Sequence, residues 1–154
     1  QKIKSFVLGG HGDSMVAMLG STEVDGKKIN DLVSEGKISK EKLDQIIDRT
    51  KKGGAEIVKY LEKGSAFYAP AASGVEMAES YLKDLKKKLP CAVHLNGEYG
   101  ARDIYAGVPV IIGSGGVEKI VELELNSEEK KNFEKSIESV KDLFNAARKI
   151  DPSL

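Results

Sequence analysis

The chain lacks tryptophan altogether and has only one cysteine and two histidines in 154 residues. The single cysteine, Cys91, cannot form a disulfide within the chain, which fits a reducing compartment. A zinc site needs three or four ligands from histidine, cysteine and acidic side chains, so we expect no metal. No apolar run approaches the roughly 18 residues that span a membrane, and the N-terminal apolar stretch is too short for a signal peptide. These features predict a cytoplasmic protein without a membrane segment.

Net charge is lacking too. Lysine and arginine together number 24, aspartate and glutamate also number 24, and the formal charge is zero. A balanced chain gives no electrostatic reason to expect binding to nucleic acid or to an acidic membrane. With 40% hydrophobic and 31% charged residues, the composition is typical of one water-soluble globular domain. Because the chain does not begin with methionine, we expect a processed protein or a piece of a larger one.

Short strands are predicted in both halves of the chain. They cover residues 3–8, 89–96, 108–113 and 117–125, where apolar residues alternate with polar ones or form short runs. Residues 15–29 predict a hairpin, since Asp25-Gly26 is a strong tight-turn dipeptide. The GSGG sequence at residues 113–116 predicts a second hairpin turn.

Helices are predicted over residues 39–63, about 75–85 and 127–150. Ser39 and Ser127 are the expected N-caps, and Gly53-Gly54 marks an expected kink. Small residues at 63–74 predict a loop, and the basic residues at 83–88 predict a solvated helix end. The apolar stripe of the last helix comprises Phe133, Ile137, Val140, Leu143 and Ala147. This order of elements predicts an α+β fold, with antiparallel hairpins packed on long amphipathic helices.

The sequence GGHGDSM, residues 9–15, places His11 among three glycines at the end of a predicted strand. An imidazole titrates near neutral pH, which suits a general acid or base. Glycines beside it let a substrate approach the ring closely. A loop histidine that only caps a turn has the same sequence surroundings, so the residues alone leave both interpretations open.

Other chemistries are weaker. Ser14 lies in a GDS sequence like that of the GDSL-type hydrolases, but no histidine here follows an aspartate at Asp-x-x-His spacing, so the serine lacks a base. The GSGG turn lacks the third glycine of a dinucleotide fingerprint, because that position is Glu118. His94 lies in an alternating stretch, and we interpret it as a half-exposed strand histidine.

Several motifs together resemble the lactate/malate dehydrogenase family. They are GGHGDSM followed by VAMLGSTEVDGKKI, then KGGAEIVKYLEKGSAFYAPAAS, EMAES and NGEYGARDIYAGVPVIIGSGGVEKIVELELNSEEK. The resemblance covers the whole chain and implies that residues 1–154 are the substrate-side, C-terminal domain. It favours the bacterial NAD-dependent malate dehydrogenases, since lactate dehydrogenases usually carry threonine where Ala66 stands and isoleucine where Pro70 stands.

The resemblance also implies roles. His11 would accept the hydroxyl proton of malate as hydride passes to NAD, and would return it to oxaloacetate in reverse. Gly10 would lie beside the substrate, Ser65 and Ala66 would line the pocket, and Pro70 would lie against the nicotinamide.

Asp13 and Ser14 match the same motif, and we expect them to hold the loop rather than react. The N-terminal Rossmann domain, the substrate-binding arginine, the aspartate that orients the histidine and the mobile loop would all lie upstream, and no arginine of this chain matches them. The resemblance therefore implies an N-terminal domain as partner, a homo-oligomer in the full-length protein, and an isolated chain that binds cofactor poorly and is inactive. The alternatives are a lactate dehydrogenase domain and an inactive self-associating module.

Overall fold

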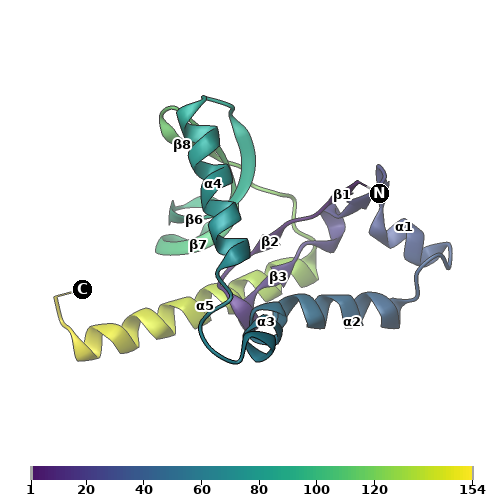
Figure 1. The fold of residues 1–154 in the computed structure, drawn as a ribbon, viewed down its shortest axis with the longest axis horizontal. Coiled ribbons are helices and arrows are strands. Elements are labelled where there is room, and N and C mark those ends of the chain that lie inside the picture. Colours follow the sequence, from purple (N-terminus) through teal and green to yellow (C-terminus); the bar gives the residue numbers. More distant parts are fainter. Residues whose placement is uncertain (1, 154) are drawn as a thin grey trace.

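A computed structural model describes residues 2–153 of the chain (Figure 1). Within this part the helices are α1 (Ile29–Ser34), α2 (Lys40–Lys51), α3 (Gly53–Leu61), α4 (Tyr68–Leu82) and α5 (Ser127–Ile150), with short 3-10 turns η1 (Gly12–Ser14), η2 (Leu19–Ser21) and η3 (Glu98–Gly100). The strands are β1 (Ile3–Lys4), β2 (Val7–Leu8), β3 (Val16–Ala17), β4 (Glu23–Val24), β5 (Lys27–Lys28), β6 (Lys87–Asn96), β7 (Arg102–Gly113) and β8 (Gly116–Ile120). Every strand pairing is antiparallel, which confirms the predicted α+β class.

The centre of the fold is the three-stranded sheet β6–β7–β8. Every second residue of a strand lies on the same face of the sheet. On the buried face, Cys91 and Leu95 of β6 lie opposite Val108 and Ile104 of β7. Phe133 and other residues of α5 belong to the same apolar cluster. Figure 1 shows α4 beside this sheet and α5 passing under β2 and β3, and β7 contacts both helices. The strand predicted at residues 108–113 is the second half of β7, which begins at Arg102.

The N-terminal strand predicted at 3–8 is split in two. β1 pairs with β4, whereas β2 pairs with β3. The predicted hairpin is confirmed only as the short pair β4–β5, which turns at Asp25 and Gly26 with φ values of 50° and 81°. The rest of residues 15–24 is divided between β3 and η2, because the chain leaves one partner strand for another there.

The first long helix was predicted well at its start. The Ser39 side chain accepts the Lys42 N–H at 3.1 Å, as expected of an N-cap. The predicted kink is a break into α2 and α3 at Lys52, next to the two glycines.

The second helix begins earlier and ends earlier than predicted. α4 starts at Tyr68 within the predicted small-residue loop, because alanines favour a helix and Pro70 lies in the first turn, where its missing N–H breaks no helical bond. The expectation that 83–88 is a basic helix end is wrong. Asp84 and Lys86 have positive φ values, so they form a turn, and Lys87 already begins β6.

Two further boundaries needed correction. The strand predicted to end at residue 125 ends at Ile120. Val121 still donates its N–H to Pro109 O of β7 at 2.8 Å, and residues 122–125 lie outside any strand. There the Tyr99 hydroxyl donates to Val121 O and accepts from Leu123 N–H, both at 2.9 Å, so a side chain replaces the strand partner. The N-cap of α5 is Asn126 rather than Ser127, since the Asn126 side chain accepts the first free N–H groups of the helix.

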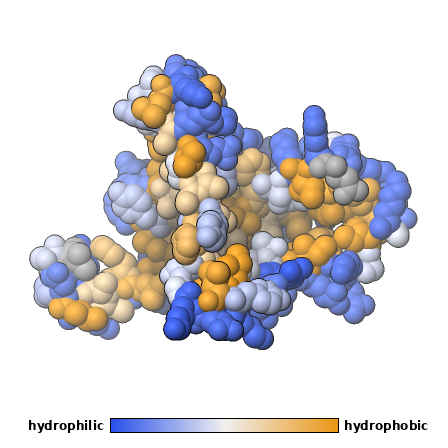
Figure 2. Space-filling model, in the orientation of Figure 1, coloured by the Kyte–Doolittle hydropathy of each residue, from blue (hydrophilic) through white to orange (hydrophobic). Residues whose placement is uncertain are grey.

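Much of the predicted helical apolar surface is exposed. Val75 and Leu82 of α4 expose 69% and 78% of their surface, and Leu143, which belongs to the predicted stripe of the last helix, exposes 72%. Other exposed apolar residues on α3 and α4 are Ile57, Val58, Tyr60, Leu61, Tyr68, Met77 and Tyr81. Figure 2 shows apolar atoms on the surface in the region that α4 and α3 occupy in Figure 1. No helix within residues 2–153 is long and apolar enough to cross a membrane.

Candidate active-site loop

The loop that carries His11 is anchored to the central sheet by the residue two positions before it. The Gly9 N–H donates to Gly107 O at 2.9 Å, and the Gly107 N–H donates back to Gly9 O at 2.8 Å. β8 pairs with β7 only from Val110 onward, so this stretch of the β7 edge is open to Gly9. This bridge links the end of β2 to the main sheet, and the glycine-rich loop begins at a fixed point.

The same loop is anchored from the other side by α5. The Gly10 N–H donates to the Ser136 hydroxyl at 2.8 Å, across 126 positions of sequence, and Ser136 is only 2% exposed. A Cβ on Gly9 would lie 2.2 Å from the Ser136 Oγ, and Gly9 has a φ of 93°. A Cβ on Gly10 would lie 2.4 Å from the Ser14 Oγ and 3.1 Å from the Val140 Cγ2. Both positions therefore require glycine because α5 and the following turn lie so close.

His11 itself is exposed and precedes η1. Its carbonyl accepts the Ser14 hydroxyl at 3.4 Å, and the Met15 N–H closes the turn on Gly12 O at 3.0 Å. The imidazole makes no hydrogen bond or ion pair with any other residue in the described part of the chain, and its ring is open to a ligand. The expectation that Ser14 holds the loop agrees with its bond. Asp13 is exposed and accepts no hydrogen bond from residues 2–153, so the structure gives it no such part.

The second group of predicted site residues lies between α3 and α4. Ser65 is exposed and Ala66 half-buried in the connection, and Pro70 is exposed in the first turn of α4. Among residues 2–153, no hydrogen bond or ring contact joins this group to His11. The two regions are linked through α2, which contacts both η1 and α3.

Charged side chains lie where the two regions are linked. The pKa of Lys52, at the junction of α2 and α3, is raised mainly by its hydrogen bond to Asp48, and the negative charge of Asp13 adds a smaller effect. α2, which ends at this junction, also contacts η1 of the His11 loop.

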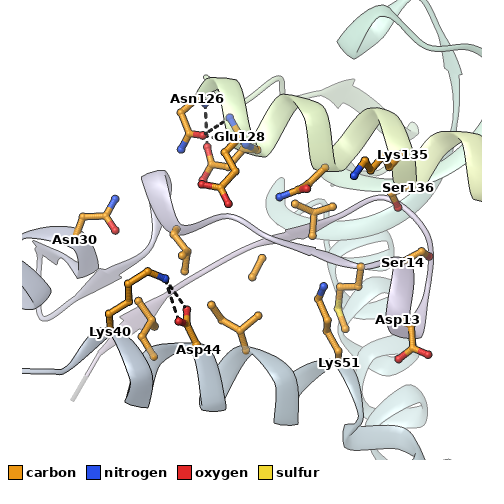
Figure 3. A pocket seen from close by; sticks show the side chains of 18 of the residues that line it. Asp13, Ser14, Asn30, Lys40, Asp44, Lys51, Asn126, Glu128, Lys135 and Ser136 are labelled. Carbon is orange, nitrogen blue, oxygen red and sulfur yellow. Dashed lines mark hydrogen bonds and ion pairs between the residues drawn. The ribbon is translucent and has the colours of Figure 1, made fainter.

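A cavity of about 560 Å³ lies behind the loop, between α2, β3 and α5 (Figure 3). Asp13 and Ser14 line it on the loop side, and Ser136 lines it on α5. Its other walls carry charges of both signs: Lys40 pairs with Asp44 at 3.0 Å, and Lys51, Lys135, Glu128 and Glu129 complete the charged lining. A mixed lining of this kind does not select a ligand of one charge.

The turn at 113–116 is a hairpin turn, as predicted, and its amides are already occupied. The Ser114 N–H donates to the Asp84 carboxylate at 2.8 Å, and the Gly115 N–H donates to Glu118 at 3.4 Å. Carboxylates thus occupy the positions that phosphate oxygens take in a dinucleotide loop. This turn does not fit the phosphates of a cofactor.

The remaining candidate groups lie elsewhere. His94 is exposed on β6, with its ring edge-on to Tyr105 at 5.3 Å, in agreement with a strand histidine. Burial raises the pKa of the Cys91 thiol, so this group is a poor nucleophile. Within residues 2–153, no three His, Cys, Asp or Glu side chains group closely enough to hold a metal ion.

Sequence reasoning missed Ser136 and Gly107, the two residues that fix the His11 loop. Gly107 interrupts an apolar strand, and a glycine there is a signal of close backbone approach. Ser136 is a polar residue on the apolar side of α5, beside Ile137. Neither signal shows that the residue contacts the His11 loop, because both contacts join distant parts of the sequence.

Comparison with known proteins identifies the group to which the chain is related. Residues 1–150 match the family described as lactate/malate dehydrogenase, alpha/beta C-terminal domain. Over all 154 residues the chain is 66% identical to a malate dehydrogenase of Pelagibacter ubique and 56% identical to one of Caulobacter vibrioides, and it covers 48% of each. The chain thus spans about half the length of these relatives.

Solved structures agree. The crystal structure of Cryptosporidium parvum malate dehydrogenase matches with a TM-score of 0.91 and 44% identity, over 96% of this chain and 47% of that one. The lactate dehydrogenase of Eimeria maxima, solved with NADH and oxamate, matches with a TM-score of 0.92 and 41% identity, over 97% and 47%. The chain belongs to the lactate/malate dehydrogenase family, as its C-terminal α/β domain.

Proposed function

We propose that the chain is the substrate-side catalytic half of an NAD-dependent malate dehydrogenase, which interconverts (S)-malate and oxaloacetate. The observation that carries the proposal is the exposed His11, whose loop is held between β7 and α5. Two relatives at 66% and 56% identity are named malate dehydrogenase, which favours malate over other hydroxy acids.

The chemistry follows from the imidazole. In malate oxidation, His11 accepts the hydroxyl proton while hydride leaves the same carbon, and the C–O bond becomes a carbonyl. In reverse, protonated His11 donates a hydrogen bond to the ketone and then transfers the proton to the developing alkoxide. Gly10 lies beside the ring without a side chain, so the substrate carbon has room to approach. Bound NAD supplies the hydride acceptor, which no side chain can replace.

The chain's residues fit one end of that cofactor. Ser65 and Ala66 are small, and Pro70 presents an exposed rigid ring in the first turn of α4, so together they could form one wall of a nicotinamide pocket. The occupied amides at 113–116 offer nothing for the phosphates. We therefore assign most of the cofactor binding to an N-terminal Rossmann domain.

The same domain is the partner that the exposed apolar residues of α3 and α4 favour. The relatives are about twice as long as this chain, and apolar patches of this kind are unusual on a free surface. In the full-length protein the patch would be covered by the N-terminal half and by a second subunit of a homo-oligomer. The isolated chain would then lack both substrate orientation and cofactor, and we expect it to be inactive.

The test joins this chain to the N-terminal half of the Pelagibacter ubique malate dehydrogenase. NADH oxidation is measured with oxaloacetate for the hybrid, for the chain alone, and for the hybrid with His11→Asn. We expect activity only in the unaltered hybrid. An active His11→Asn hybrid would show that this residue is not the proton donor.

Lactate dehydrogenase activity is the second candidate, because the Eimeria maxima lactate dehydrogenase is as similar in structure as the malate dehydrogenases. The same hybrid assayed with pyruvate separates the two. Since the N-terminal half also influences substrate choice, Ala66→Thr and Pro70→Ile should be tested with both substrates. An inactive hybrid that light scattering shows to be a stable oligomer would instead support a self-associating module.

A further inference from the structure

We propose that Ser136 is a positioning residue for His11, which it holds in place through the backbone of Gly10. The proposal rests on the proposed function, since it assigns Ser136 to the proton transfer that His11 performs. Its own basis is a contact that joins the far end of the chain to the residue next to the imidazole.

The contact is short and partly buried. The Gly10 N–H donates to the Ser136 Oγ at 2.8 Å, and Ser136 is 2% exposed. Ser136 also lines the cavity between α2, β3 and α5, so removal of its hydroxyl leaves the Gly10 N–H to a cavity water or to a shift of the backbone. A buried N–H without a partner is unfavourable enough that the backbone shifts to find one.

Because of the neighbouring contacts, this hydrogen bond helps to fix where His11 lies. On one side Gly9 is bonded in both directions to Gly107 of the main sheet. On the other side α5 is so close that a Cβ on Gly9 would lie 2.2 Å from the Ser136 Oγ. The Gly9–Gly10 peptide is thus held between sheet and helix: its C=O accepts the Gly107 N–H, and its N–H donates to the Ser136 hydroxyl.

This restraint also limits the position of His11, because His11 follows Gly10 directly. The His11 side chain has no hydrogen-bond or ion-pair partner of its own in residues 2–153. The later bonds of the loop, from Ser14 to His11 O and from Met15 to Gly12 O, lie within the turn. They shape the turn but do not tie it to the rest of the molecule. A displacement of about 1 Å in a reacting group can reduce a rate by about a hundredfold, so the restraint bears on the chemical step.

Ser139 provides a matched control. It lies three residues further along α5, lines the same cavity and is exposed, and its hydroxyl donates to Lys135 O at 3.2 Å within its own helix. Ser139→Ala therefore makes the same chemical change on the same helix without touching the loop.

The experiment compares Ser136→Ala, Ser136→Cys and Ser139→Ala in the hybrid with the Pelagibacter ubique N-terminal half. We measure kcat and KM for oxaloacetate and NADH, and the isotope effect on kcat with NADH deuterated at the transferred hydride. Ser136→Ala should lower kcat by about tenfold or more with little change in KM for NADH. It should also raise the isotope effect, because a slowed chemical step becomes rate-limiting. Ser136→Cys, with a weaker acceptor at the same place, should fall between.

Two further readouts separate the possible failures. Hydrogen–deuterium exchange of the peptide that contains Gly10 should accelerate in Ser136→Ala and not in Ser139→Ala, whether or not the hybrid is active. If Ser136→Ala does not fold, the same rates, isotope effect and exchange are measured on Ser136→Cys instead. Rates, isotope effect and exchange equal to those of Ser139→Ala would overturn the positioning role. An active His11→Asn hybrid would instead overturn the proposed function, while accelerated exchange of Gly10 would still report the contact.

Discussion

Gly9 and Gly107 exchange two backbone hydrogen bonds, of 2.9 Å and 2.8 Å, although 98 positions separate them in the sequence. This pairing extends the central sheet to the start of the His11 loop. The approach is close: a Cβ on Gly107 would lie 3.0 Å from the Gly9 carbonyl oxygen. The backbone around Gly9 cannot yield easily, because Ser136 lies against its other side.

Gly107→Ala should therefore destabilise the chain by about 1–3 kcal/mol, as overpacking against a fixed neighbour does. Urea unfolding measures the change. Gly115→Ala is the control, because its Cβ would meet only the Glu118 side chain, at 3.6 Å. Equal stability of the two variants would mean that Gly9 moves freely away from β7. In the hybrid enzyme, Gly107→Ala should also lower the rate, since it displaces the loop.

Ser80 joins α4 to the central sheet. Its hydroxyl is fully buried, donates to Ile112 O at 2.7 Å and accepts the Lys87 N–H at 3.2 Å. Ser80→Ala leaves both backbone groups without that partner and should lower the free energy of unfolding by about 1–3 kcal/mol. Ser73→Ala, on an exposed position of the same helix, should be neutral or slightly stabilising. A neutral Ser80→Ala would show that water or a backbone shift replaces the hydroxyl.

Glu129 ties the start of α5 to the N-terminal segment. One carboxylate oxygen accepts the Gly20 N–H at 2.8 Å and the other accepts the Asn126 N–H at 3.0 Å. Glu129→Gln puts an amide N–H₂ against one of these donors, so we expect a loss of about 1–3 kcal/mol in urea unfolding. Glu128→Gln is the control. It removes the same charge from the same end of α5, where the helix dipole favours both carboxylates to a similar extent, but the Glu128 side chain is exposed. Similar losses in both variants would assign the effect to charge alone.

Local signals explain which parts of the fold could be predicted. The turn at Asp25-Gly26, the cap at Ser39, the hairpin turn at 113–116 and the body of α5 each depend on residues close in sequence, and all four are found. Some errors are local, such as the N-cap of α5 at Asn126 in place of Ser127. Others lie where a distant partner decides. Residues 121–125 alternate like a strand, but after the Val121 N–H, which bonds to β7, the Tyr99 hydroxyl takes the place of a neighbouring strand.

The candidate site shows the same division. The motif around His11 indicated a proton-transfer loop, but nothing local to that motif shows that Ser136 and Gly107 hold it. Periodicity likewise identified an apolar stripe on α5 without showing what covers it, and Leu143 of that stripe is exposed in this chain. A pattern gives the chemical character of a surface, whereas its partner depends on the whole fold.

Asp84 gives the chain a stability that depends on pH. It lies in the turn between α4 and β6, and its carboxylate accepts the Ser114 N–H of the β7–β8 turn at 2.8 Å. This hydrogen bond is the main reason that the pKa of the carboxyl lies below its ordinary value of 3.8, and nearby Lys86 lowers it further. A carboxyl with a lowered folded-state pKa stabilises the fold above its unfolded pKa, and the contribution disappears as the pH falls through the folded value.

Asp84→Asn should therefore reduce the free energy of unfolding at neutral pH, and the difference from the unaltered chain should shrink as the pH falls below 3.8. Asparagine tolerates the positive φ of 49° found at this position, so the substitution tests the charge and not the turn. Urea unfolding of both proteins between pH 7 and pH 2 measures the effect. A difference that stays constant over this range would mean that the ionised carboxylate stabilises the fold no more than the protonated carboxyl does. A difference that vanishes at low pH would assign the link between the two turns to the charge-assisted bond from Ser114.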